Sequence, residues 1–150
     1  MDKLDLVQLI TALYAALPGI SHYRVPAEMP DVHILPRIVL QDLVCGGPCH
    51  IQAIYHPDFG LMIEEALMKG GIYERSIIFH ELVHHAQHID GKFNELHTAC
   101  ERRAAAEQEA YALQNRYLGA NGYFQPVPVI NWLRLCQKQQ ARETAVLSFE

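Results

Sequence analysis

The chain has 150 residues, of which 50% are hydrophobic and 19% are charged, and its formal net charge at pH 7 is −5. This length and composition predict a single domain with one ordinary hydrophobic core. With 12 basic against 17 acidic residues and no basic cluster, the chain gives no indication of nucleic acid or an anionic membrane as a partner. No apolar run approaches the roughly 18 residues expected of a membrane span.

Residues 6–17 are apolar enough to be tested as a signal peptide. Asp2 and Asp5 flank Lys3, where a signal peptide carries net positive charge. Apolar side chains recur at helical spacing, at Leu6, Leu9, Ile10, Leu13 and Leu17. The segment therefore predicts an amphipathic core helix over about residues 3–16, ending near Pro18. We expect a cytoplasmic protein by default, or an extracytoplasmic one if a signal was removed before this chain was made.

The next third of the chain predicts a small sheet. Residues 31–35 form a short strand candidate, and Pro36 suits the first turn of a short helix that ends near Gly46. The apolar runs HIQAIY (50–55) and LMIEEAL (61–67) are joined by HPDFG, which predicts a β-hairpin.

Three longer helices are expected in the remainder. The first covers residues 72–89 and ends at Asp90-Gly91. The second covers about residues 100–118, with Thr98 and Glu101 as a capping box at its start. The third lies within residues 127–146 and turns Trp132 and Leu135 inward. The expected fold class is α+β, with a few long helices packed on a short sheet or hairpin.

Four cysteines leave the disulfide state open. The stretch CGGPC can close a small loop between Cys45 and Cys49, or either of them can pair with Cys100. Four cysteines, with Cys136 as the last, permit three full pairings, and spacing alone does not choose among them. Free or buried thiols are the favoured state, and at least one disulfide is the alternative. A structural zinc site made by all four is not expected, because only one pair is closely spaced.

The stretch SIIFHELVHHAQHID, residues 76–90, contains H-E-x-x-H. His80 and His84 lie four residues apart on one helix face, so both can bind one zinc ion. Glu81 can reach a water molecule at that ion without being a ligand. The alternative is a histidine-rich surface helix. His85 and His88 lie off the ligand face or near the helix end, so we expect them to face solvent or cap the helix.

A catalytic zinc site usually has three protein ligands and a water molecule. On the helix of residues 100–118, Glu107 shares a largely apolar stripe with Cys100, Ala104, Tyr111 and Leu118. Glu101 and Glu109 lie on other faces of this helix, and we expect both to face water. If the two long helices pair antiparallel, His80 and His84 come level with about residues 103–107. Glu107 is the expected third ligand and Glu109 the reserve; a surface salt bridge is the alternative.

HELVH, followed after 22 residues by EQEAY, resembles the gluzincin pattern of zinc metallopeptidases, in which HExxH precedes a glutamate in an E-x-x-A context. The small size resembles the minimal members, the minigluzincins, and the two motifs together resemble a group of small bacterial proteins. The resemblance covers roughly residues 50–118. It implies one zinc ion held by His80, His84 and Glu107, with Glu81 as general base. It also implies a hairpin whose edge strand lines the cleft and holds an extended peptide.

The chain departs from this pattern at one position. Gluzincins often have an aspartate one turn after the third ligand, where it orients a ligand histidine, and this chain has Tyr111 there. The Tyr111 hydroxyl can orient a histidine or face the cleft and stabilise an oxyanion, and simple packing is the alternative. Other candidates for the oxyanion are Tyr73, Tyr117, His97 and His56.

The sequence thus predicts a zincin-like metallopeptidase domain over residues 1–150, a hydrolase that acts on a peptide or protein substrate. The alternative is a zinc-binding regulatory or interaction module that holds the metal without turnover. The fourth metal position distinguishes them. Water there indicates an open, catalytic site, whereas a side chain such as His97 or Cys100 indicates a closed one.

Overall fold

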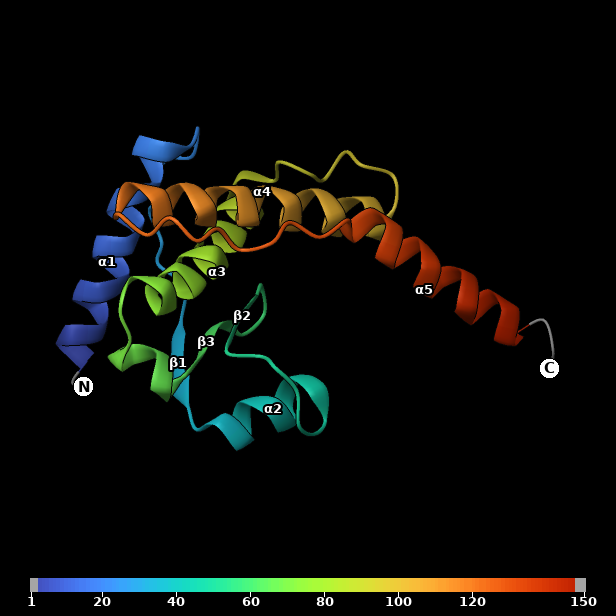
Figure 1. Ribbon diagram of the computed structural model, residues 1–150, viewed down its shortest axis with the longest axis horizontal. Helices are drawn as coiled ribbons and strands as arrows, with labels where there is room; N and C mark the ends of the chain where they lie inside the picture. The colour runs from blue at the N-terminus through green and yellow to red at the C-terminus, as the bar shows by residue number, and fades with distance from the viewer. Residues whose placement is uncertain (1–2, 148–150) are drawn as a thin grey trace.

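The protein has an α+β fold, as expected, in which helices surround a small three-stranded sheet (Figure 1). The computed structural model describes residues 3–147, and the side chains of residues 5–143. In chain order the elements are α1 (Lys3–Ile20), β1 (Val32–Leu35), α2 (Arg37–Cys45), β2 (Ala53–His56), β3 (Gly60–Glu64), the short 3-10 helix η1 (Glu65–Lys69), α3 (Ile72–Asp90), α4 (Ala99–Ala120) and α5 (Trp132–Leu147).

The sheet has the strand order β1-β3-β2, so β2 is an edge strand. β1 runs parallel to β3, while β2 and β3 form the expected antiparallel hairpin, with Ala53 opposite Ile63 and His56 opposite Gly60. Gly60 begins β3 at φ +82°, and a Cβ there would lie 2.4 Å from the carbonyl oxygen of Asp31. A side chain at this position would therefore separate β3 from the start of β1.

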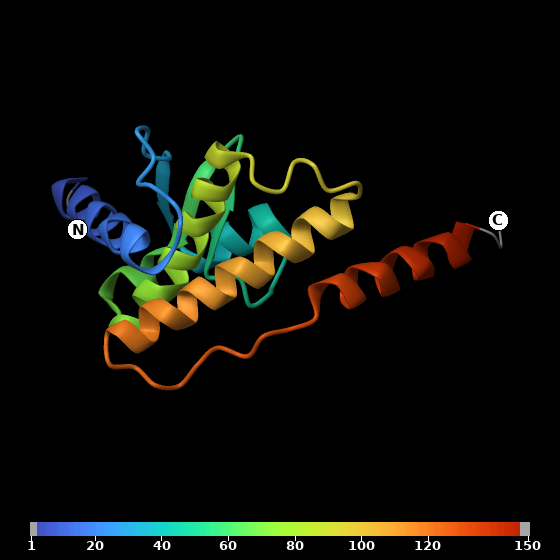
Figure 2. The ribbon, with the colours of Figure 1, turned by 90° about the horizontal axis from the view of Figure 1, so that it is seen from above.

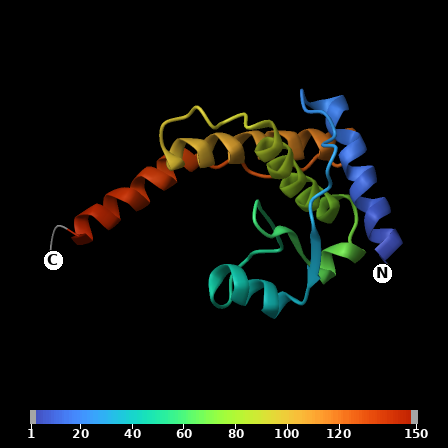
Figure 3. The same ribbon diagram turned by 180° about the vertical axis from the view of Figure 1, so that it is seen from behind.

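The core lies where α1 and α3 meet the sheet. α1 is the core helix that its spacing predicts, although it continues to Ile20, about one turn beyond its expected end. Apolar side chains from these three parts are packed together and almost fully buried: Ile10, Leu13, Tyr14, Leu17, Leu61, Ile63, Ile78, Phe79, Leu82 and Val83. Figures 1 and 3 show α2 on the side of the sheet away from α4.

α3 and α4 pair antiparallel, and this pairing builds the candidate site. Contacts join His84 to Glu107 and Gln87 to Ala106. His80 contacts both Glu107 and Gln114, so it lies level with the part of α4 between them, whereas the sequence predicted about residues 103–107 for the two histidines. The pairing is thus about one turn further along α4 than expected. The reason is visible in Figure 2, because the turns of residues 91–98 carry the chain beyond the end of α3 before α4 begins.

α5 is attached to the body at its first turns only. Residues 121–131 return along α4, and α5 then points away from the rest of the molecule (Figures 1 and 2). The prediction that Leu135 faces inward is wrong, because this side chain is 49% exposed on the projecting helix. Trp132 is partly buried against α4.

All four cysteines are oxidised. Cys45 and Cys49 close the CGGPC loop, and Cys100 of α4 is joined to Cys136 of α5. The expectation of free thiols is therefore wrong. Spacing could not predict the second bridge, because it depends on the chain returning along the whole length of α4. Among the described helices, none combines the length and apolar character needed to cross a membrane.

Candidate metal centre

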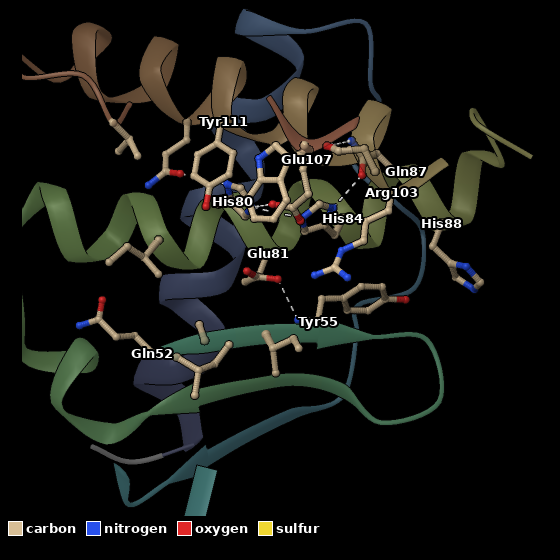
Figure 4. A pocket seen from close by; sticks show the side chains of 18 of the residues that line it. Gln52, Tyr55, His80, Glu81, His84, Gln87, His88, Arg103, Glu107 and Tyr111 are labelled. Carbon is tan, nitrogen blue, oxygen red and sulfur yellow. Dashed lines mark hydrogen bonds and ion pairs between the residues drawn. The ribbon is translucent and has the colours of Figure 1, made fainter. Parts of the chain in front are cut away.

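Three side chains from α3 and α4 converge on one point (Figure 4). His84 Nε2 lies 2.6 Å from Glu107 Oε1, His80 Nε2 lies 3.5 Å from Glu107 Oε2, and the two Nε2 atoms are 3.2 Å apart. The potential ligand atoms all lie within 4.8 Å of one another. The three residues that the sequence analysis proposed as ligands are thus brought together, and the group is able to hold a metal ion.

A chain of hydrogen bonds fixes the orientation of His80. The Ser76 hydroxyl donates to the main-chain carbonyl of Tyr73 at 2.6 Å, so its oxygen accepts from Gln114 Nε2 at 3.1 Å. The carbonyl end of the Gln114 amide then faces His80 Nδ1 at 3.0 Å and accepts its proton. A neutral His80 therefore carries its proton on Nδ1 and presents the Nε2 lone pair to the centre.

His84 is oriented in the same way by a second glutamine. Gln87 Nε2 donates to the carbonyl of Ala106 at 3.0 Å, which can only accept, and to Glu109 Oε1 at 3.1 Å. Gln87 Oε1 consequently accepts from His84 Nδ1 at 2.8 Å. The Nε2 lone pair of a neutral His84 also points to the centre. Hydrogen bonds of this kind to the outer nitrogen are typical of metal-binding histidines.

The chemistry of the converging atoms fits a cation. Two imidazole lone pairs and a carboxylate repel one another at these separations unless a positive charge lies among them. Burial alone would lower the pKa of His84, but its hydrogen bond to Glu107 and the charge of Glu81 raise it to about 9. Burial likewise favours protonated Glu107, but hydrogen bonds from His80 and His84 lower its pKa to about 2. A proton thus satisfies the group in a metal-free chain, and a metal ion can replace it.

Glu81 has a different environment from Glu107. Its Oε2 accepts a hydrogen bond from the main-chain N–H of Tyr55 on β2 at 2.9 Å, which ties α3 to the edge strand. Burial raises the pKa of the Glu81 carboxyl, and the charges of His84 and His80 offset that rise only in part. The two neighbouring carboxyl groups thus have pKa values shifted in opposite directions.

The site lies at the base of a cleft of about 700 Å³ between β2, α3 and α4. Residues 50–55 form one side of it. The N–H of Glu64 donates to the carbonyl of Gln52 at 2.8 Å. In this antiparallel register the main-chain groups of the even-numbered residues of β2 form the hydrogen bonds to β3. The main-chain groups of Ala53 and Tyr55 therefore point outward toward the cleft.

The chain matches no protein-family model, no curated protein and no solved structure. The chemical interpretation of the cleft therefore depends on its own geometry.

Tyr111 packs against the His80 ring and does not orient it through a hydrogen bond. Its ring meets the His80 ring edge-on with centroids 4.3 Å apart, and its other face stacks on Trp132 at 6.0 Å. The role of orienting His80 belongs to Gln114. Tyr111 lines the cleft, and Figure 4 shows its hydroxyl end on the side of Glu81.

The other oxyanion candidates differ in position. Tyr73 lines the cleft. Tyr117 is buried against Phe79, with ring centroids 4.8 Å apart. His97 and His56 are exposed and do not line the cleft. Of the candidates for binding the oxyanion, Tyr111 and Tyr73 are thus the two that line the cleft.

Two expectations for neighbouring residues, those for His85 and Glu109, are corrected by the structure. His85 is buried, with Nδ1 hydrogen-bonded to the Tyr14 hydroxyl, because α1 packs on that side of α3. His88 is exposed, as expected. Glu109 does not simply face water, because it binds Gln87, Lys92 and the Tyr23 hydroxyl. Glu101 donates its N–H to Thr98 Oγ1 at 3.0 Å, which is one half of the expected capping box.

The sequence analysis missed Gln87 and Gln114. A signal for both was present. Gln87 follows His84 by three residues, and Gln114 follows Glu107 by seven, so each lies on the same helix face as a ligand. Both are buried polar side chains, at 6% and 3% exposure, which themselves require partners.

Proposed function

We propose that the protein is a zinc-dependent metallopeptidase of the gluzincin type, which hydrolyses a peptide bond in a peptide or protein substrate. The observation that carries the proposal is the position of Glu81. The Glu81 carboxyl group lies beside the group formed by His80, His84 and Glu107. It has a raised pKa and accepts a hydrogen bond from β2, the edge strand that lines the cleft.

Zinc is the metal that the donor set favours. Two neutral imidazole nitrogens and one carboxylate oxygen are the ligands of many catalytic zinc sites, in which the fourth position takes water or substrate. Among the described residues, no further side chain joins the three-residue group. Cys100 is engaged in its disulfide and His97 lies outside the cleft, so neither candidate for a fourth ligand is available.

In the proposed reaction each of these side chains has a separate role. His80, His84 and Glu107 would hold the ion, which would polarise a carbonyl oxygen and lower the pKa of a water molecule toward about 7. Glu81 would accept a proton from the water as its oxygen bonds to the carbonyl carbon, and would deliver that proton to the amine nitrogen as the C–N bond breaks. Its raised pKa favours the first transfer, because burial makes the Glu81 carboxylate a stronger base than an exposed one. The Tyr111 hydroxyl supplies a hydrogen bond to the oxyanion.

The test uses purified wild-type protein and the Glu81→Gln variant. We expect about one zinc ion per chain in both by elemental analysis, and cleavage of a peptide library by the wild type only. The glutamine keeps an oxygen that accepts from the Tyr55 N–H, so the fold and the metal are retained while the base is lost. Undiminished cleavage by Glu81→Gln would remove Glu81 from the mechanism. One bound zinc ion without cleavage by the wild type would favour the non-catalytic module.

A further inference from the structure

The cleft carries two arginines beside two acidic side chains, in a protein that is acidic as a whole. The formal net charge of the chain is −5. Among the described residues, the acidic side chains that line the cleft are Glu81 and Glu107, and both already have partners, Tyr55 for Glu81 and the two histidines for Glu107. Two arginines of α4, Arg102 and Arg103, line it as well. An arginine in this cleft attracts an anionic group if its own charge is not already paired.

The two arginines differ in what their guanidinium groups do. Arg102 donates to the main-chain carbonyl of Leu96 at 2.8 Å, which holds it at the start of α4. Arg103 is exposed, and its guanidinium carbon lies 5.8 Å from the centroid of the Trp132 ring. Among the described side chains, no carboxylate forms an ion pair with Arg103. Its hydrogen-bond donors are therefore free for a ligand.

The position of Arg103 places those donors beside the candidate reaction centre. It precedes Glu107 by four residues, so both lie on the same face of α4. Figure 4 shows its side chain reaching from α4 toward β2, across the mouth of the cleft. The Trp132 ring, itself stacked on Tyr111, supports the guanidinium. An arginine held over an aromatic ring keeps its planar donor edge available for a carboxylate.

We infer that Arg103 determines specificity by binding a carboxylate of the substrate, so that the protein selects peptides with an acidic group close to the scissile bond. This inference takes from the proposed function that the ligand is a peptide, but binding of the carboxylate by Arg103 does not require turnover. Either an aspartate or glutamate side chain or a free C-terminus provides the same carboxylate. Peptides that carry only one of the two distinguish these sources.

The binding experiment uses the zinc-loaded Glu81→Gln protein, which does not consume its ligand. The probes are five-residue alanine peptides with both ends blocked and either Asp or Asn in the centre, together with an all-alanine peptide that has a free C-terminus. Trp132 is the only tryptophan of the chain, so its fluorescence reports on the ring beneath Arg103. Calorimetry provides the second measure of affinity.

We expect the Asp peptide or the free-C-terminus peptide to bind about 10- to 100-fold more tightly than the Asn peptide, as is usual for a charge-assisted hydrogen-bonded pair. Arg103→Met should remove this preference, Arg103→Lys should keep part of it, and Arg103→Glu should reverse it. The matched control is Arg116→Met. Arg116 is an exposed arginine on the same helix that binds the carbonyl of Ile20 and does not line the cleft.

The outcomes separate the two proposals. Equal binding of acidic and neutral peptides, or an acidic preference that survives in Arg103→Met, would overturn the inference even if the wild type cleaves both. Absence of binding by every probe would overturn it as well. An acidic preference that depends on Arg103, in a wild type that cleaves no peptide, would support the inference and contradict the peptidase proposal. Thermal melting of each variant shows whether a loss of binding reflects a loss of fold.

Discussion

The amide of Gln114 provides a sharp test of the metal centre, because it is the partner of His80 Nδ1. Methionine has nearly the same length and volume but offers neither end of the amide. In Gln114→Met the Nδ1–H of His80 loses its acceptor, 3.0 Å away in the wild type. A buried donor left without a partner costs about 1–3 kcal/mol. For a chain of this size that lowers the melting temperature by roughly 2–10 °C.

The larger effect is expected on the metal. Without its acceptor the imidazole is free to rotate and to change tautomer, so the Nε2 lone pair no longer points constantly at the centre. Loss of such a partner typically reduces metal affinity by about 10- to 100-fold. The measurement is a competition titration at pH 7.5 against a chromophoric zinc chelator, with melting curves recorded with and without zinc.

Two variants at the same place serve as controls. Gln114→Glu retains an acceptor for His80 Nδ1, so we expect its zinc affinity to stay within about threefold of the wild type or to rise. Ser76→Ala removes the partner of Gln114 Nε2, 3.1 Å away, and leaves the bond to His80 in place, so its effect should be smaller than that of Gln114→Met. A folded Gln114→Met protein that binds zinc as tightly as the wild type would refute the argument from orientation.

Other predictions concern the ligands, the pH dependence and the cleft. Glu107→Ala should lose more than about 100-fold in zinc affinity by the same titration, whereas Glu109→Ala, which only loosens Gln87, should lose less than about 10-fold; the reverse order would make Glu109 the ligand. In chelator-treated protein the pKa of His84 is raised to about 9 and that of Glu107 lowered to about 2. Stability from His84 is complete below its ordinary pKa of 6.5 and is lost as the pH rises through 9, and stability from Glu107 is present above its ordinary 4.5 and is lost toward pH 2. The melting temperature without zinc should therefore fall between pH 7 and 9.5, and a rise over that interval would contradict the pairing. Tyr111→Phe keeps both ring contacts and should reduce kcat by about 10-fold or more at unchanged zinc content; an unaltered kcat would exclude the hydroxyl from oxyanion binding.

The parts of the site that the sequence predicted are those set by local geometry. The spacing of His80 and His84 is a property of any helix, and the phase of Glu107 on its own helix needs no knowledge of the rest of the fold. The hairpin was predicted for the same reason, since apolar runs around a turn specify antiparallel pairing locally.

The parts that were missed depend on how distant segments pack. His85 was expected to face solvent or cap the helix. That prediction was wrong because Tyr14, which covers this side of α3, is distant in the sequence. The one-turn shift of α4 follows from the path of residues 91–98, whose turns have no strong periodic signal. The two glutamines have no charge and belong to no familiar motif, so their role becomes clear only when both ends of each amide are assigned partners.

The two disulfides stand next to opposite walls of the cleft. Cys49 directly precedes the segment His50–Gln52, which lines one wall, and Cys136 lies one helical turn after Trp132, which lines the other. The three potential ligands, in contrast, lie on α3 and α4, which pack together without help from either bridge at that point. We therefore expect reduction to loosen the segments next to the two bridges before it disturbs the paired helices that carry the potential ligands. On the proposed function, peptide binding therefore depends on surroundings oxidising enough to form both cystines, whereas the helix pair that would hold the ion does not.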